Sequence, residues 1–306
     1  MKAVKILSSN KEYIWGGNKL KQYSIKSNDS NIAEAWIFSF NPNGLSTDAN
    51  GNALPNVLLA EDLGEKYSQF ETFPYLIKLI DADKMLSIQV HPNDEYAKKN
   101  EHSLGKCELW YILEAKEGAF IYLGLNDNYT PNQVKEAIRN NTICNLLNKV
   151  YVKKGDCYFV DSGTIHSIGE GIVLLEVQQN STLTYRVYDF ARKDKNGKLR
   201  ELHIDKALDV INFKKLEVVN IKSEELMKTN YFVANKISNI KSLSAKKDAG
   251  FVISFIEGNG IIDNQPFAKG NTFFIKANQT VDISGDYTAI TTSIWKKAAW
   301  LQPFIN

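Results

Sequence analysis

The feature that most constrains the fold is a series of short β-prone runs, each bounded by Gly, Pro, Asn or Asp. The runs are 33–40, 75–80, 85–91, 108–113, 119–123, 157–160 and 172–178. Many short strands separated by turn residues are typical of a sandwich, a barrel or a jelly roll. We therefore predict a mainly β fold.

Helical signals are fewer and lie between these runs. The Thr130-Pro131-Asn132-Gln133 stretch combines an N-cap, a proline at the first helical position and a glutamine at the third. The apolar spacing that follows predicts helical segments across 131–148, with a break near Asn140. Shorter helices are predicted at 93–102 and 204–212.

The composition is that of an ordinary globular protein. The 306 residues are 43% hydrophobic and 24% charged, a length for which two domains are a reasonable expectation. The 37 basic and 35 acidic residues are interspersed and leave a net charge of +2. This pattern argues against nucleic acid or a membrane surface as a partner.

Targeting signals and cysteines point to a reducing compartment. The first ten residues lack the apolar run of a signal peptide, and no stretch approaches a membrane span. Cys107, Cys144 and Cys157 are odd in number and form no C-x-x-C pattern, which disfavours a disulfide framework or a thiolate zinc site. We expect a cytoplasmic protein.

A set of four side chains suggests a metal site. Gln89 and His91 are two residues apart, so on an extended strand both point to the same face. Glu108 and His166 follow in strand-like or turn-like settings. Together they form a plausible N/O ligand set for a divalent metal, with positions left for water or substrate.

The chain also contains a short sequence pattern that occurs twice. The pattern G-x5-D-x-G-x-x-H over 155–166 is followed by G-x5-K-x-N-x-x-V over 270–281, at the same offsets. Asn278 can adopt the left-handed turn that the first pattern gives to glycine, but Val281 cannot act as a ligand. We predict a second sheet domain on the same plan, without a metal.

The first copy of this pattern resembles the second conserved motif of cupins, small β-barrels that hold a metal. A fuller set of motifs resembles the type I mannose-6-phosphate isomerases in order and spacing. Its members are Trp15-Gly16-Gly17, Ser-Ile-Gln-Val-His-Pro-Asn-Asp (87–94), Gly-Lys-Cys-Glu-Leu-Trp-Tyr-Ile-Leu (105–113), Ser-Gly-Thr-Ile-His-Ser-Ile-Gly (162–169), Gln-Gln-Asn-Ser (178–181), Thr-Tyr-Arg-Val-Tyr-Asp (184–189) and Arg-Glu-Leu-His-Ile-Asp-Lys-Ala-Leu-Asp-Val (200–210). The resemblance covers about the first 210 residues, and the remainder of the chain matches only in architecture.

The resemblance implies a bicupin, in which two cupin-type jelly-roll β-barrels follow one another. A few helices are inserted in the N-terminal catalytic half. We place a metal-binding catalytic domain at 1–220 and a C-terminal cupin-like domain, without metal ligands, at 221–306.

The resemblance also implies the site residues. One zinc ion per chain would be bound by Gln89, His91, Glu108 and His166. Four further residues would act on the substrate: Arg186 as the catalytic arginine, with Lys106, Lys78 and Glu176 beside it. Two positions depart from the family pattern, because the usual proline falls at Asp161 and a family aspartate falls near Thr182.

The implied reaction interconverts mannose 6-phosphate and fructose 6-phosphate by moving a proton between C1 and C2 through an enediol or enediolate. Zinc would take up charge that develops on the substrate oxygens, and Arg186 would hold charge without losing its proton. Lys106, Lys78 and Glu176 all remain possible proton-transfer bases. The binding partner is thus a small sugar phosphate, although no Gly-rich loop indicates where its phosphate binds.

Two other functions stay open at this point. A metal-dependent cupin oxygenase would more usually offer a histidine-rich site with open positions for iron. A non-catalytic sugar-binding bicupin would not need a full ligand set. Gln89 and the nearby lysines favour the isomerase over the oxygenase, and the four ligands together with Arg186 favour it over the binding module.

Overall fold

Two antiparallel sheets make up the middle of the chain. The computed structural model describes residues 2–27, 31–193 and 197–295. A six-stranded sheet runs, in spatial order, through β10 (Cys157–Val160), β7 (Glu108–Ala115), β12 (Ile172–Gln179), β5 (Tyr75–Ala82), β3 (Glu34–Phe38) and β2 (Ser9–Lys11). A five-stranded sheet runs through β13 (Tyr185–Tyr188), β6 (Ile88–Val90), β11 (His166–Ile168), β8 (Phe120–Leu125) and β9 (Leu147–Tyr151).

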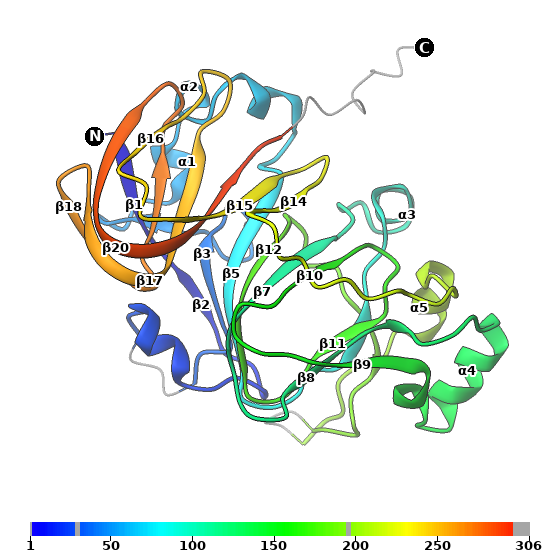
Figure 1. The fold of residues 1–306 in the computed structure, drawn as a ribbon. Helices are drawn as coiled ribbons and strands as arrows, with labels where there is room; N and C mark the ends of the chain where they lie inside the picture. The colour runs from blue at the N-terminus through cyan, green and yellow to red at the C-terminus, as the bar shows by residue number, and fades with distance from the viewer. Residues whose placement is uncertain (1, 28–30, 194–196, 296–306) are drawn as a thin grey trace, which may run out of the picture.

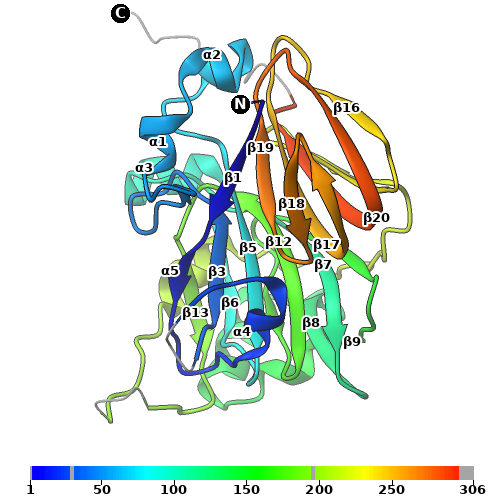
Figure 2. The same cartoon turned by 90° about the vertical axis from the view of Figure 1, so that its left-hand side faces the viewer.

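A third sheet of nine strands is built mostly from the C-terminal part of the chain (Figure 1). Its path is β14 (Glu225–Lys228), β15 (Val233–Ser238), β20 (Thr280–Ser293), β17 (Phe251–Ile262), β19 (Thr272–Ile275), β1 (Ala3–Leu7) and β4 (Thr47–Asp48), with β16 (Ser242–Ser244) on β20 and β18 (Gln265–Ala268) on β17. Figure 2 shows the N-terminal strand β1 lying beside β19. Two N-terminal strands therefore extend the C-terminal sheet, while the division of the chain at residue 220 stays a prediction.

The six-stranded sheet is the central layer of the molecule. Along β7, Leu109 and Tyr111 belong to a core cluster shared with the nine-stranded sheet, whereas Trp110 and Ile112 belong to a cluster shared with the five-stranded sheet. This alternation follows from the two-residue period of a strand. Because the nine-stranded sheet covers one face and the five-stranded sheet covers the other, β5 and β12 are buried at every position.

These observations confirm the mainly β prediction. Each of the seven predicted runs contains a strand, from β3 to β12. The strands β9, β11 and β13 of the five-stranded sheet were not predicted. None of the described helices has the length and apolar character needed to cross a bilayer.

The predicted helices are also confirmed. They are α3 (Asp94–Glu101), α4 (Pro131–Arg139) and α5 (Ile204–Val210), and Figure 1 shows them gathered on the side of the five-stranded sheet. Thr130 and Gln133 form the capping box of α4, and a left-handed Asn141, with φ of 59°, follows its end. The 3₁₀ segment Ile143–Leu146 follows the predicted break within 131–148. One-turn helices without a periodic signal were missed; these are α1 (Leu54–Val57), α2 (Ala60–Leu63) and the 3₁₀ segments Lys19–Tyr23 and Glu65–Gln69.

The two copies of the repeated sequence pattern, at 155–166 and 270–281, share a backbone geometry. Gly155 and Gly270 have φ values of 85° and 88°, and each lies two residues before a strand of its sheet. Gly163 and Asn278 are both left-handed, with φ values of 82° and 59°. Val281 is buried in an apolar cluster of the third sheet. The two turns therefore share their backbone geometry, and the second ends at an apolar valine.

Gly163 ties the turn before β11 to the strand that carries His91. Its N–H donates to the His91 carbonyl at 2.8 Å, and a Cβ at this position would lie 2.8 Å from the Val210 carbonyl oxygen. We expect Gly163→Ala to lower the free energy of unfolding through backbone strain of about 1–2 kcal/mol plus the clash. Urea denaturation measures the loss. Gly51→Ala is the control, because Gly51 has φ of 86° and no atom near the added Cβ; equal losses in the two variants would contradict the role of the close contact.

Candidate metal centre and adjoining cavity

The five-stranded sheet projects three polar side chains from one row of its register. On β11, β6 and β13, His166 lies opposite Gln89, and Gln89 lies opposite Arg186. Directly opposed residues on neighbouring strands point to the same face. The two ligand candidates and the arginine therefore share one surface of this sheet.

The six-stranded sheet presents a second row of polar side chains. Glu176 on β12 lies between Trp110 on β7 and Lys78 on β5, and Trp36 on β3 is opposite Lys78. Glu108 precedes Trp110 by two residues, so it projects to the same side. The space between the two sheets thus receives polar groups from both.

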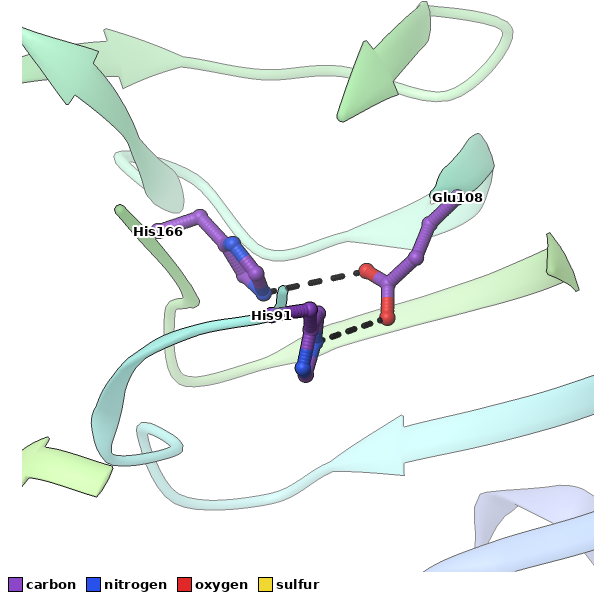
Figure 3. Close-up of side chains that lie close together, drawn as sticks. All are labelled: His91, Glu108 and His166. Atoms are coloured by element: carbon purple, nitrogen blue, oxygen red, sulfur yellow. Dashed lines mark ion pairs between the residues drawn. The ribbon is translucent and has the colours of Figure 1, made fainter. Parts of the chain in front are cut away.

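Three of the four predicted ligands converge in this space (Figure 3). The Nε2 atom of His91 lies 3.1 Å from Glu108 Oε1, and the Nε2 atom of His166 lies 3.7 Å from Glu108 Oε2. All three side chains are at most 1% exposed. Within the described ranges, this is the only cluster of His, Cys, Asp or Glu with metal-binding spacing.

The hydrogen bonds of the two histidines fix their tautomers. His91 Nδ1 lies 2.9 Å from the Leu183 carbonyl oxygen, and His166 Nδ1 lies 2.8 Å from the Thr164 carbonyl oxygen. A carbonyl only accepts, so each Nδ1 carries the proton and each Nε2 directs a lone pair at Glu108. Burial, with Lys106 adding to it, lowers the pKa of His91 to about 3, and burial also lowers the pKa of His166. Both rings are neutral at pH 7.

The chemistry of this donor set fits a divalent cation. Both Glu108 oxygens are buried, and Oε1 forms an ion pair with the ammonium group of Lys106. Burial acts to raise the pKa of Glu108, but Lys106 and His91 outweigh it, so the pKa lies well below its ordinary value. A carboxylate facing two nitrogen lone pairs is an arrangement that metal binding would satisfy.

Gln89 borders the same cluster. Its amide nitrogen lies 3.4 Å from His166 Nε2. A half-turn of the amide exchanges nitrogen and oxygen, which are alike in size, and would offer Oε1 to the same point. Gln89 is therefore placed to supply the fourth ligand, as the sequence predicts.

We expect acid to destabilise the metal-free protein through His91. An unfolded histidine has a pKa of about 6.5, so below that pH the unfolded chain binds a proton that the folded protein excludes. The stabilising contribution is present above pH 6.5 and is lost as the pH falls toward 3. Between pH 6.5 and 5 the loss is about 2 kcal/mol.

Urea unfolding of wild type and His91→Gln at pH 7 and pH 5 isolates this contribution. Glu176 acts in the opposite sense, because its pKa is raised to about 6 and the folded state takes up its proton first as the pH falls. Glu176 is present in both proteins, so its effect cancels in the comparison. Identical pH dependence in the two proteins would contradict the neutral buried histidine.

A cavity of about 300 Å³ adjoins the metal cluster. Gln89 and all four residues predicted to act on the substrate line it: Lys78, Lys106, Glu176 and Arg186. Both lysines are only 5% exposed, so neither is a solvated surface charge. The structure thus brings together every predicted site residue, either in the cluster or in the adjoining wall.

Each lysine is paired with carboxylates. Lys78 Nζ lies 3.4 Å from Glu34 Oε2 and 3.3 Å from Glu176 Oε1. Lys106 Nζ lies 2.5 Å from Glu108 Oε1. Burial acts to lower the pKa of Lys78, but Glu34 and Glu176 outweigh it and raise the pKa, so Lys78 stays charged.

Glu176 is poised to exchange a proton near neutral pH. Burial and the charge of Glu108 raise its pKa to about 6, against the opposing effect of Lys78. The indole N–H of Trp110 donates to Glu176 Oε2 at 3.0 Å and orients the carboxyl group. A buried carboxyl with this pKa is suited to general acid–base chemistry.

Arg186 is held by its backbone and leaves part of its side chain available. His203 Nδ1 accepts from the Arg186 N–H at 3.2 Å, and the His203 N–H donates to the Arg186 carbonyl at 2.8 Å. Arg186 Nη1 donates to the Glu201 carbonyl at 2.8 Å, whereas Nε is buried and has no partner among the described residues. Arg186 lines the cavity, and its side chain retains a donor without a partner among the described residues.

Asp161 and Thr182, the two positions that depart from the family pattern, lie in a turn and in the cavity wall, respectively. Asp161 builds the turn before β11, because its carboxylate accepts from the Ser162 N–H at 2.8 Å and its carbonyl from the Thr164 N–H at 3.1 Å. Thr182 lines the cavity without supplying a carboxylate. The acidic residues of the cavity wall are Glu34 and Glu176.

Sequence reasoning missed several residues of the site. Ser87 lines the cavity and could have been found, because it precedes Gln89 by two positions and so shares its face. Glu34 and Arg200 also line the cavity, but nothing local in the sequence connects them with the ligand strands. Cys107 lies on the other face of its strand, in the apolar core, and all three cysteines are free as predicted.

A further missed residue, Asp94, connects the ligand strand with the C-terminal sheet. Its Oδ1 accepts from the Gly105 N–H at 2.7 Å and from the Gln179 amide at 3.0 Å, and its Oδ2 accepts from Tyr231 at 2.5 Å. Gln179 in turn accepts from the Cys107 N–H at 3.0 Å. This network fixes the segment that carries Lys106 and Glu108.

Comparison with known proteins gives consistent results. Residues 3–120 match the family model described as phosphomannose isomerase type I, catalytic domain. The mannose-6-phosphate isomerase ManA of Bacillus subtilis is 40% identical over 280 residues, covering 85% of this chain and 89% of its own, and that of Streptococcus mutans is 37% identical, covering 81% and 83%. The crystal structure of the mannose 6-phosphate isomerase from Bacillus subtilis superposes with a TM-score of 0.84 at 33% identity, covering 95% of this chain and 99% of its own.

Proposed function

The chain belongs to the type I phosphomannose isomerase family, and we propose that it interconverts mannose 6-phosphate and fructose 6-phosphate with one bound zinc ion. The observation that supports this proposal is that a metal-binding cluster and a polar cavity lie next to each other. A buried His91–Glu108–His166 cluster adjoins a cavity whose wall holds two lysines, a glutamate and an arginine.

His91, Glu108 and His166 would hold the metal, with Gln89 as the fourth ligand. When bound, the ion would supply Lewis acidity to the carbonyl and adjacent hydroxyl oxygens of the sugar. Two neutral imidazoles, one carboxylate and one amide leave the site with net positive charge, which suits that purpose.

Among the three candidate bases, Glu176 is the best supported. Its pKa of about 6 makes the carboxylate available at neutral pH while keeping it basic enough to accept a carbon-bound proton. Lys78 stays charged and therefore serves to orient Glu176 and to hold a substrate oxygen. Lys106 lies 2.5 Å from Glu108 and is placed to donate to an oxygen beside the metal ligands.

Arg186 would stabilise charge on the reacting oxygens. The position of Arg186 in the cavity wall supports this assignment, and the guanidinium remains charged throughout. The His203 contacts hold the Arg186 backbone, and the Glu201 carbonyl accepts from Nη1, so neither interaction uses Nε.

The finer description of the fold is also a proposal. We infer that the six-stranded and five-stranded sheets, which face each other across the cavity, form one cupin barrel, and that the nine-stranded sheet forms the second. Three free cysteines support a reducing compartment such as the cytoplasm.

Nuclear magnetic resonance of mannose 6-phosphate with zinc-loaded protein tests the reaction directly. Fructose 6-phosphate should appear and approach equilibrium, with solvent deuterium entering at C1 when the reaction runs in deuterium oxide. Two histidines and one carboxylate also match the ligand set of iron oxygenases. Oxygen uptake by the iron-loaded protein, without isomerisation by any metal form, would favour that second candidate.

A further inference from the structure

We propose that Tyr231, a residue of the C-terminal part of the chain, is a positioning residue for the metal centre. Through Asp94 and Gln179 its phenol holds the backbone that carries Lys106 and Glu108, so zinc affinity depends on the nine-stranded sheet. This inference rests on the proposed function, because it names a residue that supports the proposed metal ligands. Tyr231 belongs neither to the metal cluster nor to the cavity beside it.

Tyr231 lies in the turn that joins β14 to β15, at one edge of the nine-stranded sheet (Figure 1). Thr229 closes this turn, because its hydroxyl oxygen accepts from the Tyr231 N–H at 3.1 Å and from the Phe232 N–H at 3.0 Å. The side chain of Phe232 is fully buried in the core that the nine-stranded and six-stranded sheets share, and its ring lies edge-on to that of Tyr75 on β5. The phenol of Tyr231 is therefore presented from a turn that is anchored in the core.

The carboxylate of Asp94 joins Tyr231 to the two segments that carry metal ligands. Asp94 begins α3, three residues after His91. Its Oδ1 accepts from the Gly105 N–H at 2.7 Å, and its Oδ2 accepts from the Tyr231 hydroxyl at 2.5 Å. The two segments touch at this point, because a Cβ added to Gly105 would lie 2.5 Å from the Asp94 nitrogen. One carboxylate thus connects the His91 segment, the segment before Glu108 and the β14–β15 turn.

Gln179 extends this connection to the start of β7. Its side-chain amide donates to Asp94 Oδ1 at 3.0 Å and accepts from the Cys107 N–H at 3.0 Å. The Gln179 N–H also donates to the Cys107 carbonyl at 3.1 Å. These bonds fix the peptide groups on both sides of Cys107, which link it to Lys106 and to Glu108.

A cavity of about 720 Å³ adjoins this network and is lined in part by Asp94, Cys107, Gln179 and Tyr231. Burial, with Asp94 adding to it, raises the pKa of Tyr231, so the phenol stays protonated and donates. Without the hydroxyl, water in the cavity would solvate the Asp94 carboxylate but would not hold it to the β14–β15 turn. Loss of the hydroxyl should therefore loosen the ligand segment more than it destabilises the fold.

Tyr231→Phe and the matched control Tyr23→Phe test this role. Tyr23 also donates to a carboxylate, at 2.7 Å from Glu114 Oε1. Glu114 lies on the same strand as Glu108, about 20 Å away at about 3.3 Å per residue. Groups that orient metal ligands change metal affinity by about 10- to 100-fold. Because Tyr231 acts through Asp94, we expect zinc binding to weaken by about 10-fold in Tyr231→Phe and to stay unchanged in Tyr23→Phe, as measured by chelator competition.

Amide hydrogen exchange of the metal-free proteins, followed by nuclear magnetic resonance, needs neither zinc nor turnover. The Gly105 and Cys107 amides should exchange faster in Tyr231→Phe than in wild type, whereas the amides of β17 and β19 should keep their wild-type rates. A uniform increase across all strands would show a loss of global stability alone and would overturn the proposal.

Excess zinc distinguishes positioning from catalysis. The metal ligands remain in Tyr231→Phe, so at saturating zinc its kcat for mannose 6-phosphate should return to within a few-fold of wild type, with KM unchanged. Asp94→Asn should weaken zinc binding by itself, and adding Tyr231→Phe should cause little further loss, because both residues act through one contact.

Zinc affinity in folded Tyr231→Phe equal to that of wild type or of Tyr23→Phe would overturn the inference, as would additive losses in the double variant. A wild-type protein that binds no zinc would instead count against the proposed function. In that case the exchange rates of the metal-free proteins would still decide whether Tyr231 holds the ligand segment.

Discussion

Glu108→Gln is expected to abolish metal binding and isomerase activity together. The substitution keeps the size of the side chain and removes the only charge among the four proposed ligands. Residues that merely support metal ligands change affinity by about 10- to 100-fold, so loss of a ligand charge should weaken zinc binding by at least about 100-fold. Chelator competition measures the affinity, and a coupled assay measures turnover at saturating metal.

Glu117→Gln is the matched control for this variant. Glu117 is an exposed residue in the turn after β7, so its substitution removes the same charge without touching the cluster. Circular dichroism verifies that both variants are folded. Stoichiometric zinc and wild-type turnover in Glu108→Gln would contradict the assignment of this cluster as the metal centre.

Arg186→Ala is expected to reduce kcat by about 10²- to 10³-fold, the range found when one donor to developing charge is removed. Zinc affinity should stay within a few-fold of wild type, because Arg186 faces the cavity and contacts none of the three clustered ligands. This retention of metal separates the arginine variant from Glu108→Gln. Steady-state kinetics and metal analysis on the same preparation check both expectations.

Arg186→Lys refines the same prediction. A lysine keeps the charge but lacks the planar, multi-donor geometry of the guanidinium. We expect recovery of only part of the lost kcat, with the control Arg139→Ala unaffected, because Arg139 is an exposed residue at the end of α4 and does not line the cavity. A wild-type kcat in Arg186→Ala, or loss of zinc from it, would contradict the proposed separation of metal and arginine.

Much of the site could be predicted because its residues follow strand alternation. Gln89 and His91 share a face by spacing alone, and Cys107 was correctly assigned to the opposite side of the strand from Glu108. The turn at Gly163 was predictable because left-handed backbone at these offsets favours glycine or asparagine. Local rules were sufficient wherever the relevant residues belong to one strand or one turn.

The remainder depends on pairing between distant segments. No local pattern indicates that β1 joins β19, across 270 residues of chain, or that Arg200 lines the same cavity as Gln89. The same holds for Asp94 and Tyr231, whose hydrogen bond joins the ligand segment to the C-terminal sheet. Such contacts are determined by sheet order and by the packing of one layer on another, which a single sequence does not display.

Titration of metal-free protein with zinc, followed by turnover of mannose 6-phosphate, tests the metal-dependent isomerase most directly. Activity should be absent without metal, should rise in proportion to added zinc, and should stop rising at one ion per chain. His91→Ala, assayed in parallel, should stay inactive at the same zinc concentrations. Turnover that survives complete removal of metal, or its absence from the fully loaded protein, would contradict a catalytic metal held by His91, Glu108 and His166.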